Sequence, residues 1–207
     1  MQALRQDRQD AANHPNRRAS SLGVWLCRKI LRMLLMPAVE SEFAEIIDLV
    51  NLAYRGAGDS ASWNVETGVL EGQRMNESLL RQELAAKPHG QLLTYREEAN
   101  GALMGTVWLE SRADGVWYLG LLAVRPDRQE RQLGRALLAA AESRAREGGA
   151  RRIRMNVLHV RSALIAWYER RGYNLSGEKE PFPYGDERFG RPLRDDLCFL
   201  VLEKDFG

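Results

Sequence analysis

A strand that runs into an arginine-rich turn and then into a long helix constrains this chain more than any other feature. Residues 124–142 read VRPDRQERQLGRALLAAAE, in which an apolar strand reaches Pro126 and a helix rich in Ala and Leu follows. The turn and the helix start carry four arginines: Arg125, Arg128, Arg131 and Arg135. A helix N-terminus presents free backbone N–H groups, and its dipole disfavours positive charge. We therefore predict a bound anion at this turn; the alternative is an ordinary connection with solvated arginines.

The length and charge distribution favour one globular domain behind an N-terminal extension. The chain has 207 residues, of which 44% are hydrophobic and 28% charged, and its net charge is +2. Residues 1–36 hold seven basic and two acidic side chains, so the remainder, 37–207, holds 23 basic and 26 acidic ones. A slightly acidic body gives no reason to propose nucleic acid as a partner. We expect the extension to be disordered or partly helical, with the functional domain over 37–207.

The end of the extension, LGVWLCRKILRMLLM (22–36), could form a short basic amphipathic helix. Such a helix would suit contact with a membrane surface or an organelle presequence, although Asp7 and Asp10 count against the presequence. We favour a non-native extension or an early start, with translation from Met33 or Met36. Membrane contact is therefore the minor reading.

The cysteines and the apolar runs favour a cytoplasmic protein without a metal site. Cys27 and Cys198 are the two cysteines and lie far apart in the sequence, so they suggest neither a disulfide framework nor a metal site. No apolar run approaches the roughly 20 residues that a membrane span needs. We expect a reducing, cytoplasmic setting.

Hydrophobic periodicity predicts a mixed α/β fold. Strands are expected over 34–39, 91–97, 102–111, 115–124, 152–158, 173–182 and 196–204. Helices are expected over 41–54, 77–87, 133–147 and 161–172, with Ser41 and Asn76 as N-caps of the first two. The strand at 115–124 is apolar on both faces and should be central in the sheet.

Two blocks of this order resemble the GCN5-related N-acetyltransferases, the GNAT superfamily. The family's coenzyme motif is Gln/Arg-x-x-Gly-x-Gly/Ala after a strand that ends in Val-x-Pro, and Gln129 and Gly134 stand at matching positions. LIAWYERRGY (164–173) is similar to the second signature, an apolar helix with a Tyr followed by Glu-x-x-Gly-aromatic. The resemblance covers about residues 34–204. It implies a mixed, mostly antiparallel central sheet flanked by helices, with a splayed CoA-binding cleft.

The resemblance also implies acetyl-CoA as co-substrate and assigns its contacts. Backbone groups of Leu122, Ala123 and Val124 should pair with the pantetheine arm and the acetyl carbonyl. The pyrophosphate should lie on the amides that follow Gln129, namely those of Glu130, Arg131, Gln132, Leu133, Gly134 and Arg135. Gln132 replaces the first motif glycine, and Glu130 brings negative charge to the proposed anion site. Arg161 stands where the family often has an Asn that contacts the coenzyme, and it could serve through its guanidinium.

Tyr168 matches the family's general acid, a phenol that protonates the leaving CoA thiolate. The alternative is a buried aromatic that packs the helix. Asn156 occupies the position of a Glu that some relatives use as a base, and an amide cannot act as one. His159 and Glu110 are the candidate bases, Glu66 or Glu71 in the loop at 55–72 is a third choice, and a water relay is an equal alternative.

These residues predict an acetyl-CoA-dependent N-acetyltransferase in which an amine attacks the thioester directly in a ternary complex. The acceptor would be a small-molecule or peptide amine, and the segment EPFPYGDERFGRPLRDDL (180–197) would help to shape its pocket. No metal is expected, and the resemblance allows a homodimer. The alternative is a non-catalytic acyl-CoA-binding module, which Gln132 and the missing strand carboxylate favour.

Overall fold

A seven-stranded mixed sheet forms the centre of the computed structural model, which describes residues 33–56, 66, 68–99, 101–126 and 132–207. In spatial order its strands are β1 (Met36–Pro37), β3 (Gly90–Arg96), β4 (Leu103–Ser111), β5 (Val116–Val124), β6 (Arg152–Leu158), β9 (Cys198–Asp205) and β7 (Asn174–Pro181). Only the β5–β6 pair is parallel among these described strands. The expected mixed and mostly antiparallel sheet is confirmed, and β5 lies at its centre as predicted.

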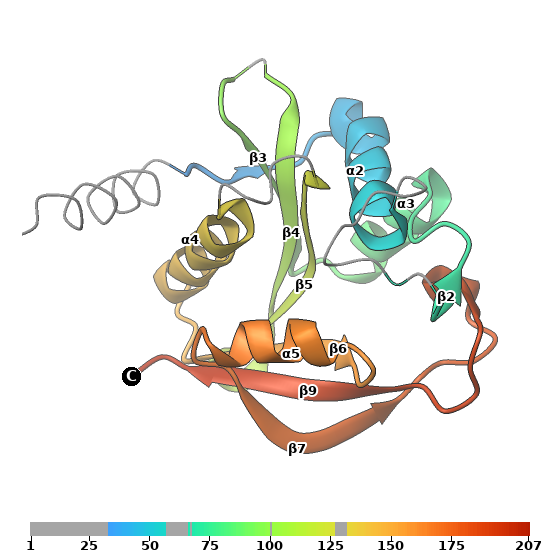
Figure 1. Cartoon of the computed structure of the whole chain (residues 1–207). Helices are drawn as coiled ribbons and strands as arrows, with labels where there is room; N and C mark the ends of the chain where they lie inside the picture. The colour runs from blue at the N-terminus through green and yellow to red at the C-terminus, as the bar shows by residue number, and fades with distance from the viewer. Residues whose placement is uncertain (1–32, 57–65, 67, 100, 127–131) are drawn as a thin grey trace, which may run out of the picture. The chain divides into compact units, whose positions relative to one another are not determined.

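Helices cover both faces of this sheet (Figure 1). They are α2 (Phe43–Arg55), α3 (Glu77–Ala86), α4 (Leu133–Glu147) and α5 (Ser162–Glu169), with short 3-10 turns η1 (Glu40–Glu42), η2 (Ala113–Gly115) and η4 (Glu187–Phe189). Helices α2 and α3 lie on one side of β4 and β5, and α4 packs on the other. No helix in the described part of the chain is long and apolar enough to cross a membrane.

The core follows from the apolar spacing of the helices. In α2 the buried side chains Ile46, Leu49 and Val50 recur at helical spacing and pack with Leu92 and Trp108 of the sheet. The face of α4 that meets the sheet is built from Leu and Ala in the same way. Burial of these side chains fixes α2 and α4 against β4 and β5.

The structure confirms one of the two predicted N-caps and contradicts the other. Asn76 caps α3, because its side chain accepts a 2.9 Å hydrogen bond from the Leu79 amide, as predicted. The expectation that Ser41 caps α2 is wrong, since Ser41 lies inside η1 and Glu42 takes the N-cap position. The Glu42 carboxylate accepts a 3.1 Å bond from the Val39 amide and so closes this turn instead.

Two neighbouring strands of the sheet diverge at a point that the sequence pattern did not predict. Strands β5 and β6 pair only at 116–118 with 152–154, and then separate. Beyond this point Val107 of β4 faces two residues of β5, Leu121 and Leu122, which is a β-bulge. Leu121 has a φ of 45°, so the backbone leaves the regular strand conformation there. The resulting gap between two neighbouring strands opens a wedge in the sheet.

A small second sheet joins β2 (Leu70–Glu71) to β8 (Arg191–Pro192). Two-residue strands carry no periodicity, so the sequence did not predict them. This pairing brings the loop before α3 next to the segment between β7 and β9. The predicted extension, as far as Arg32, lies outside the described residues.

Candidate active site

A cavity of about 370 Å³ lies where β5 and β6 diverge. Residues 119–122 of β5 and 155–158 of β6 form two of its walls, and Tyr168 of α5 lines it as well. Arg74, which follows β2, and Phe189, which precedes β8, are also on its wall. A volume of this size suits a metabolite or part of a cofactor.

One edge of β5 has no partner strand along this cavity in the described part of the chain. Beyond position 118 the strand has no partner in β6, so its backbone N–H and C=O groups on that side are available to a ligand. Leu122 lines the cavity, whereas the side chains of Ala123 and Val124 are buried in the core. The structure thus places all three predicted residues on the strand that borders the opening, and their contact with a coenzyme stays a prediction.

The start of α4 has the geometry of an anion site. No side chain caps this helix end, so its first N–H groups have no capping partner among the described residues. Leu133 and Gly134 are buried in the first turn, and Arg135 is exposed. The predicted residues Gln129, Glu130 and Arg131 lie outside the described residues.

Gln132, the N-cap of α4, adopts a left-handed backbone with φ 55°. This is the position of the first glycine in the family motif, and the left-handed region favours glycine because a Cβ is strained there. The glutamine therefore occupies this conformation at a cost.

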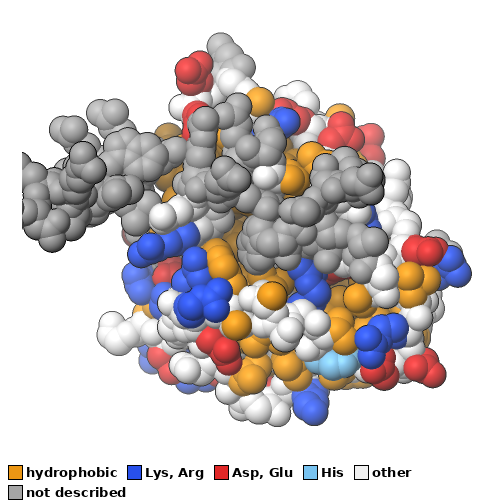
Figure 2. Space-filling view, in the orientation of Figure 1, with side chains coloured by type: hydrophobic (Ala, Val, Ile, Leu, Met, Phe, Trp, Pro, Cys, Tyr) orange, Lys and Arg blue, Asp and Glu red, His pale blue; other side chains and the backbone are white. Residues whose placement is uncertain are grey.

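Arg171 is a cation near this helix start that the sequence analysis did not single out. Burial lowers the pKa of Arg171 first, and the positive charges of Arg135 and Arg170 lower it further. Its guanidinium lies 3.6 Å from the centre of the Trp167 ring, and its buried Nε has no hydrogen-bond partner in the described part of the chain. Figure 2 shows basic side chains gathered over α4 on the face in view. The sequence signal for Arg171 is the ERRG segment (169–172) at the end of the second motif.

Tyr168 is held rigidly at the cavity. Its side chain is 5% exposed and makes edge-to-face contacts with Trp167 and Tyr173, with ring centres 4.9 and 5.6 Å away. Burial raises the pKa of Tyr168 far above its ordinary value, so the phenol remains protonated at neutral pH. Tyr168 is therefore a packed, buried aromatic residue and also a residue of the cavity wall, as the predicted general acid has to be.

The two predicted bases do not join Tyr168. His159 is not among the described residues that line the cavity; its Nδ1 accepts a 3.3 Å bond from the Cys198 amide, and its Nε2 lies 4.0 Å from Asp196. Glu110, near the end of β4, lies 3.6 Å from Arg112 and is likewise not on the wall. Neither residue lies on the cavity wall, where a base would have to reach the amine.

Two carboxylates do line the cavity, namely Glu66, which is one of the third-choice bases of the sequence analysis, and Glu180. Glu66 is buried in ion pairs with Arg55 and with Arg161, the latter at 3.6 Å, so the Arg161 guanidinium lies on the cavity wall beside an acid. Glu180 of β7 accepts a 2.6 Å hydrogen bond from the side-chain amide of Asn156. Glu180 went unnoticed in the sequence because strand pairing, rather than a motif, brings it to the site.

The comparison with protein families shows which family this chain belongs to. The sequence profile of the acetyltransferase (GNAT) family matches residues 45–173, more than half of the chain. The chain belongs to the GNAT family of acetyltransferases. No curated protein sequence matches the chain significantly.

Solved GNAT structures share this fold. A ribosomal-protein-alanine N-acetyltransferase from Brucella melitensis is 19% identical, with a TM-score of 0.58 over 84% of this chain and 99% of that one. The protein yncA from Salmonella typhimurium, solved with acetyl-CoA, is 21% identical, with a TM-score of 0.57 over 85% of this chain and 95% of that one. A GNAT acetyltransferase from Staphylococcus aureus Mu50 is 14% identical, with a TM-score of 0.57 over 84% and 99%. At these identities the likeness shows the fold.

Proposed function

We propose that this GNAT protein is an acetyl-CoA-dependent N-acetyltransferase that transfers the acetyl group to a primary amine. The observation that carries the proposal is the position of Tyr168, a protonated phenol on the wall of a cavity beside the free edge of β5. A proton donor and free backbone groups at one opening suit acyl transfer from a thioester.

The residues present fit acetyl-CoA. The free edge of β5 can pair with the amides of the pantetheine arm, in the manner of an added strand. The uncapped start of α4, with Arg135 and Arg171 nearby, suits the phosphates. When bound, acetyl-CoA supplies the activated acetyl group.

The chain's own residues would then move the protons. The amine nitrogen bonds to the acetyl carbon in a ternary complex, and Tyr168 Oη donates its proton to the sulfur as the carbon–sulfur bond breaks. Glu180 accepts the proton that the amine loses, and Tyr168 recovers a proton from solvent. Cys198 is not among the described residues on the cavity wall, which supports direct attack over a covalent enzyme intermediate.

Tyr168→Phe tests the proposal. CoA thiol release is measured with acetyl-CoA and a panel of primary amines, and acetyl-CoA binding is measured by calorimetry. We expect turnover to fall about 10²- to 10⁴-fold with unchanged affinity for acetyl-CoA. Tyr95→Phe, a buried tyrosine on β3 that does not line the cavity, serves as the control. Equal turnover by Tyr168→Phe and the wild type would refute the role of Tyr168.

A second function, acyl-CoA binding without turnover, is favoured by the strained Gln132 at the coenzyme turn. The same binding and turnover measurements, taken together, separate the two functions. Binding of acetyl-CoA with no acetyl transfer to any amine would support the binding module, and turnover would exclude it.

A further inference from the structure

Arg74 is a cation on the cavity wall that forms no ion pair with any residue that the structure describes. Its guanidinium lies over the Tyr54 and Phe189 rings, 5.7 and 5.5 Å from their centres, and its Nη1 donates a 3.3 Å hydrogen bond to the Arg188 carbonyl. No carboxylate of the described residues forms an ion pair with it. A guanidinium has five N–H donors, so most of those of Arg74 remain available to a ligand.

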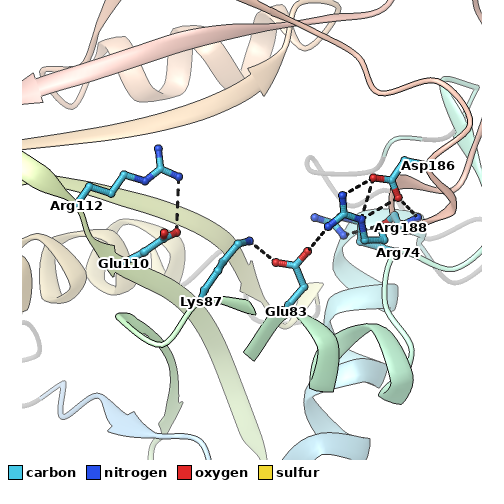
Figure 3. Close-up of polar contacts among 7 residues, drawn as sticks. All are labelled: Arg74, Glu83, Lys87, Glu110, Arg112, Asp186 and Arg188. Carbon is cyan, nitrogen blue, oxygen red and sulfur yellow. Dashed lines mark hydrogen bonds and ion pairs between the residues drawn. The ribbon is translucent and has the colours of Figure 1, made fainter. Parts of the chain in front are cut away.

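The other arginines on the wall each form an ion pair with a carboxylate. Arg188 lies between Asp186 and Glu83 and contacts both, as Figure 3 shows together with the neighbouring Arg74. Arg161 is paired with Glu66. Arg74 is therefore the wall arginine that forms no ion pair with a carboxylate of the described residues.

Glu180 is the negative counterpart. It accepts the hydrogen bond from the neutral amide of Asn156 and forms no ion pair with any cation in the described ranges. Arg154 interacts with Glu180 only at longer range, because Arg154 is paired with Glu178 at 2.7 Å and with Glu203 at 3.3 Å. The Glu180 carboxylate keeps acceptor capacity toward the cavity.

Both charges act on the same space. Tyr118 of β5 also lines the cavity, and burial raises its pKa to about 12. The positive charge of Arg74 opposes this rise and the negative charge of Glu180 adds to it. The pKa of Tyr118 therefore responds to the charges of both Arg74 and Glu180.

We infer that the acceptor is an amine that also carries a carboxylate, an amino acid or a close analogue, with its carboxylate on Arg74 and its amino group at Glu180. This inference rests on the proposed function for the same cavity. A planar carboxylate matches the guanidinium fork and can accept two hydrogen bonds from it. A half-buried cation is also stabilised when a bound anion replaces the water that it loses.

The test compares each of the common L-amino acids with its primary amide, which removes the charge at almost constant size. CoA thiol release is measured for the full chain with saturating acetyl-CoA. We expect a carboxylate to raise kcat/KM about 10- to 100-fold over the matched amide. In Arg74→Met the KM for the acid should rise by the same factor while the amide is unaffected, and Arg74→Lys should retain part of the preference.

Arg144→Gln, on the exposed side of α4, is the matched control and should leave the preference unchanged. Circular dichroism checks that each variant is folded. Equal use of acids and amides by the wild type would overturn the inference and leave acetyl transfer intact. If no amine is acetylated, the proposed function fails, and calorimetry of acids against amides in the presence of CoA decides the inference: tighter binding of the acids supports it, and equal binding refutes it.

Discussion

The side-chain amide of Asn156 donates a 2.6 Å hydrogen bond to the Glu180 carboxylate, so a residue of β6 orients an acid of β7. Strand β9 lies between these two strands. Asn156 cannot accept a proton itself, yet through this contact it holds a carboxylate at the cavity. The base that the sequence lacks at position 156 can therefore come from another strand.

Glu180→Gln should reduce kcat/KM about 10²-fold or more, because the amide cannot take the proton of the amine. Glu178→Gln, two residues away on the same strand and paired with Arg154, is the control and should leave the rate unchanged. A Glu180→Gln variant with the kcat/KM of the wild type would show that water takes the proton.

The sheet and its helices could be predicted because their signals are local. The expected strands at 102–111, 115–124 and 152–158 match β4, β5 and β6 within a residue or two, and the polar turns between them mark the ends. Asn76 is a correct cap because an Asn directly before a helix can reach the N3 amide. The prediction of Ser41 as a cap is wrong because a 3-10 turn precedes α2 and shifts the helix start. Composition does not encode this effect of backbone geometry.

The site was only partly predictable. Tyr168 and the start of α4 belong to contiguous motifs, so the sequence alone could single out both as candidates. The charge balance of the cavity depends on contacts between distant parts of the chain, such as Arg161 with Glu66 and Asn156 with Glu180. The single-sequence pattern contains no periodic signal for such pairs. For the same reason it left the base open among His159, Glu110, Glu66 or Glu71 and a water relay.

Gln132→Gly should stabilise the protein. Relief of a left-handed backbone is worth roughly 1–2 kcal/mol, and the added freedom of the unfolded chain removes about 0.4–1 kcal/mol. The expected net gain is about 0.5–1 kcal/mol, or a rise in Tm of about 1–4 °C. Gln82→Gly, inside α3, should instead cost about 1 kcal/mol. Thermal unfolding that shows the same loss for both variants would contradict strain at Gln132.

The protein should lose stability in alkaline solution as the tyrosines of the site ionise. Burial raises the pKa of Tyr118 to about 12 and also raises the pKa of Tyr168 and of Tyr173. Because the unfolded chain releases these protons near pH 10, the stability from this source is complete below pH 10 and is lost as the pH rises toward 12. Tyrosinate absorbance and circular dichroism should change together over this range, and Tyr118→Phe should weaken the dependence. Full tyrosine titration near pH 10 with the fold intact would contradict the assignment.

Glu66 should be the carboxylate whose loss most affects the loops around the cavity. Its side chain is 10% exposed and faces Arg55 and Arg161, which are 12% and 9% exposed. Glu66→Gln would leave two nearly buried cations without their acid, so we expect a loss of about 3–5 kcal/mol in the free energy of unfolding, measured in urea.

The matched control for Glu66 is Glu40→Gln, because Glu40 pairs with Arg81 at the surface with 75% and 48% of the side chains exposed. That change should cost less than about 1 kcal/mol. Arg55 also donates hydrogen bonds to the carbonyls of Gly72 and Phe189, so its release should loosen the wall that carries Arg74. The KM for the acceptor should therefore rise in Glu66→Gln while acetyl-CoA affinity is retained. A Glu66→Gln variant as stable as Glu40→Gln would show that the buried ion pairs do not hold this wall.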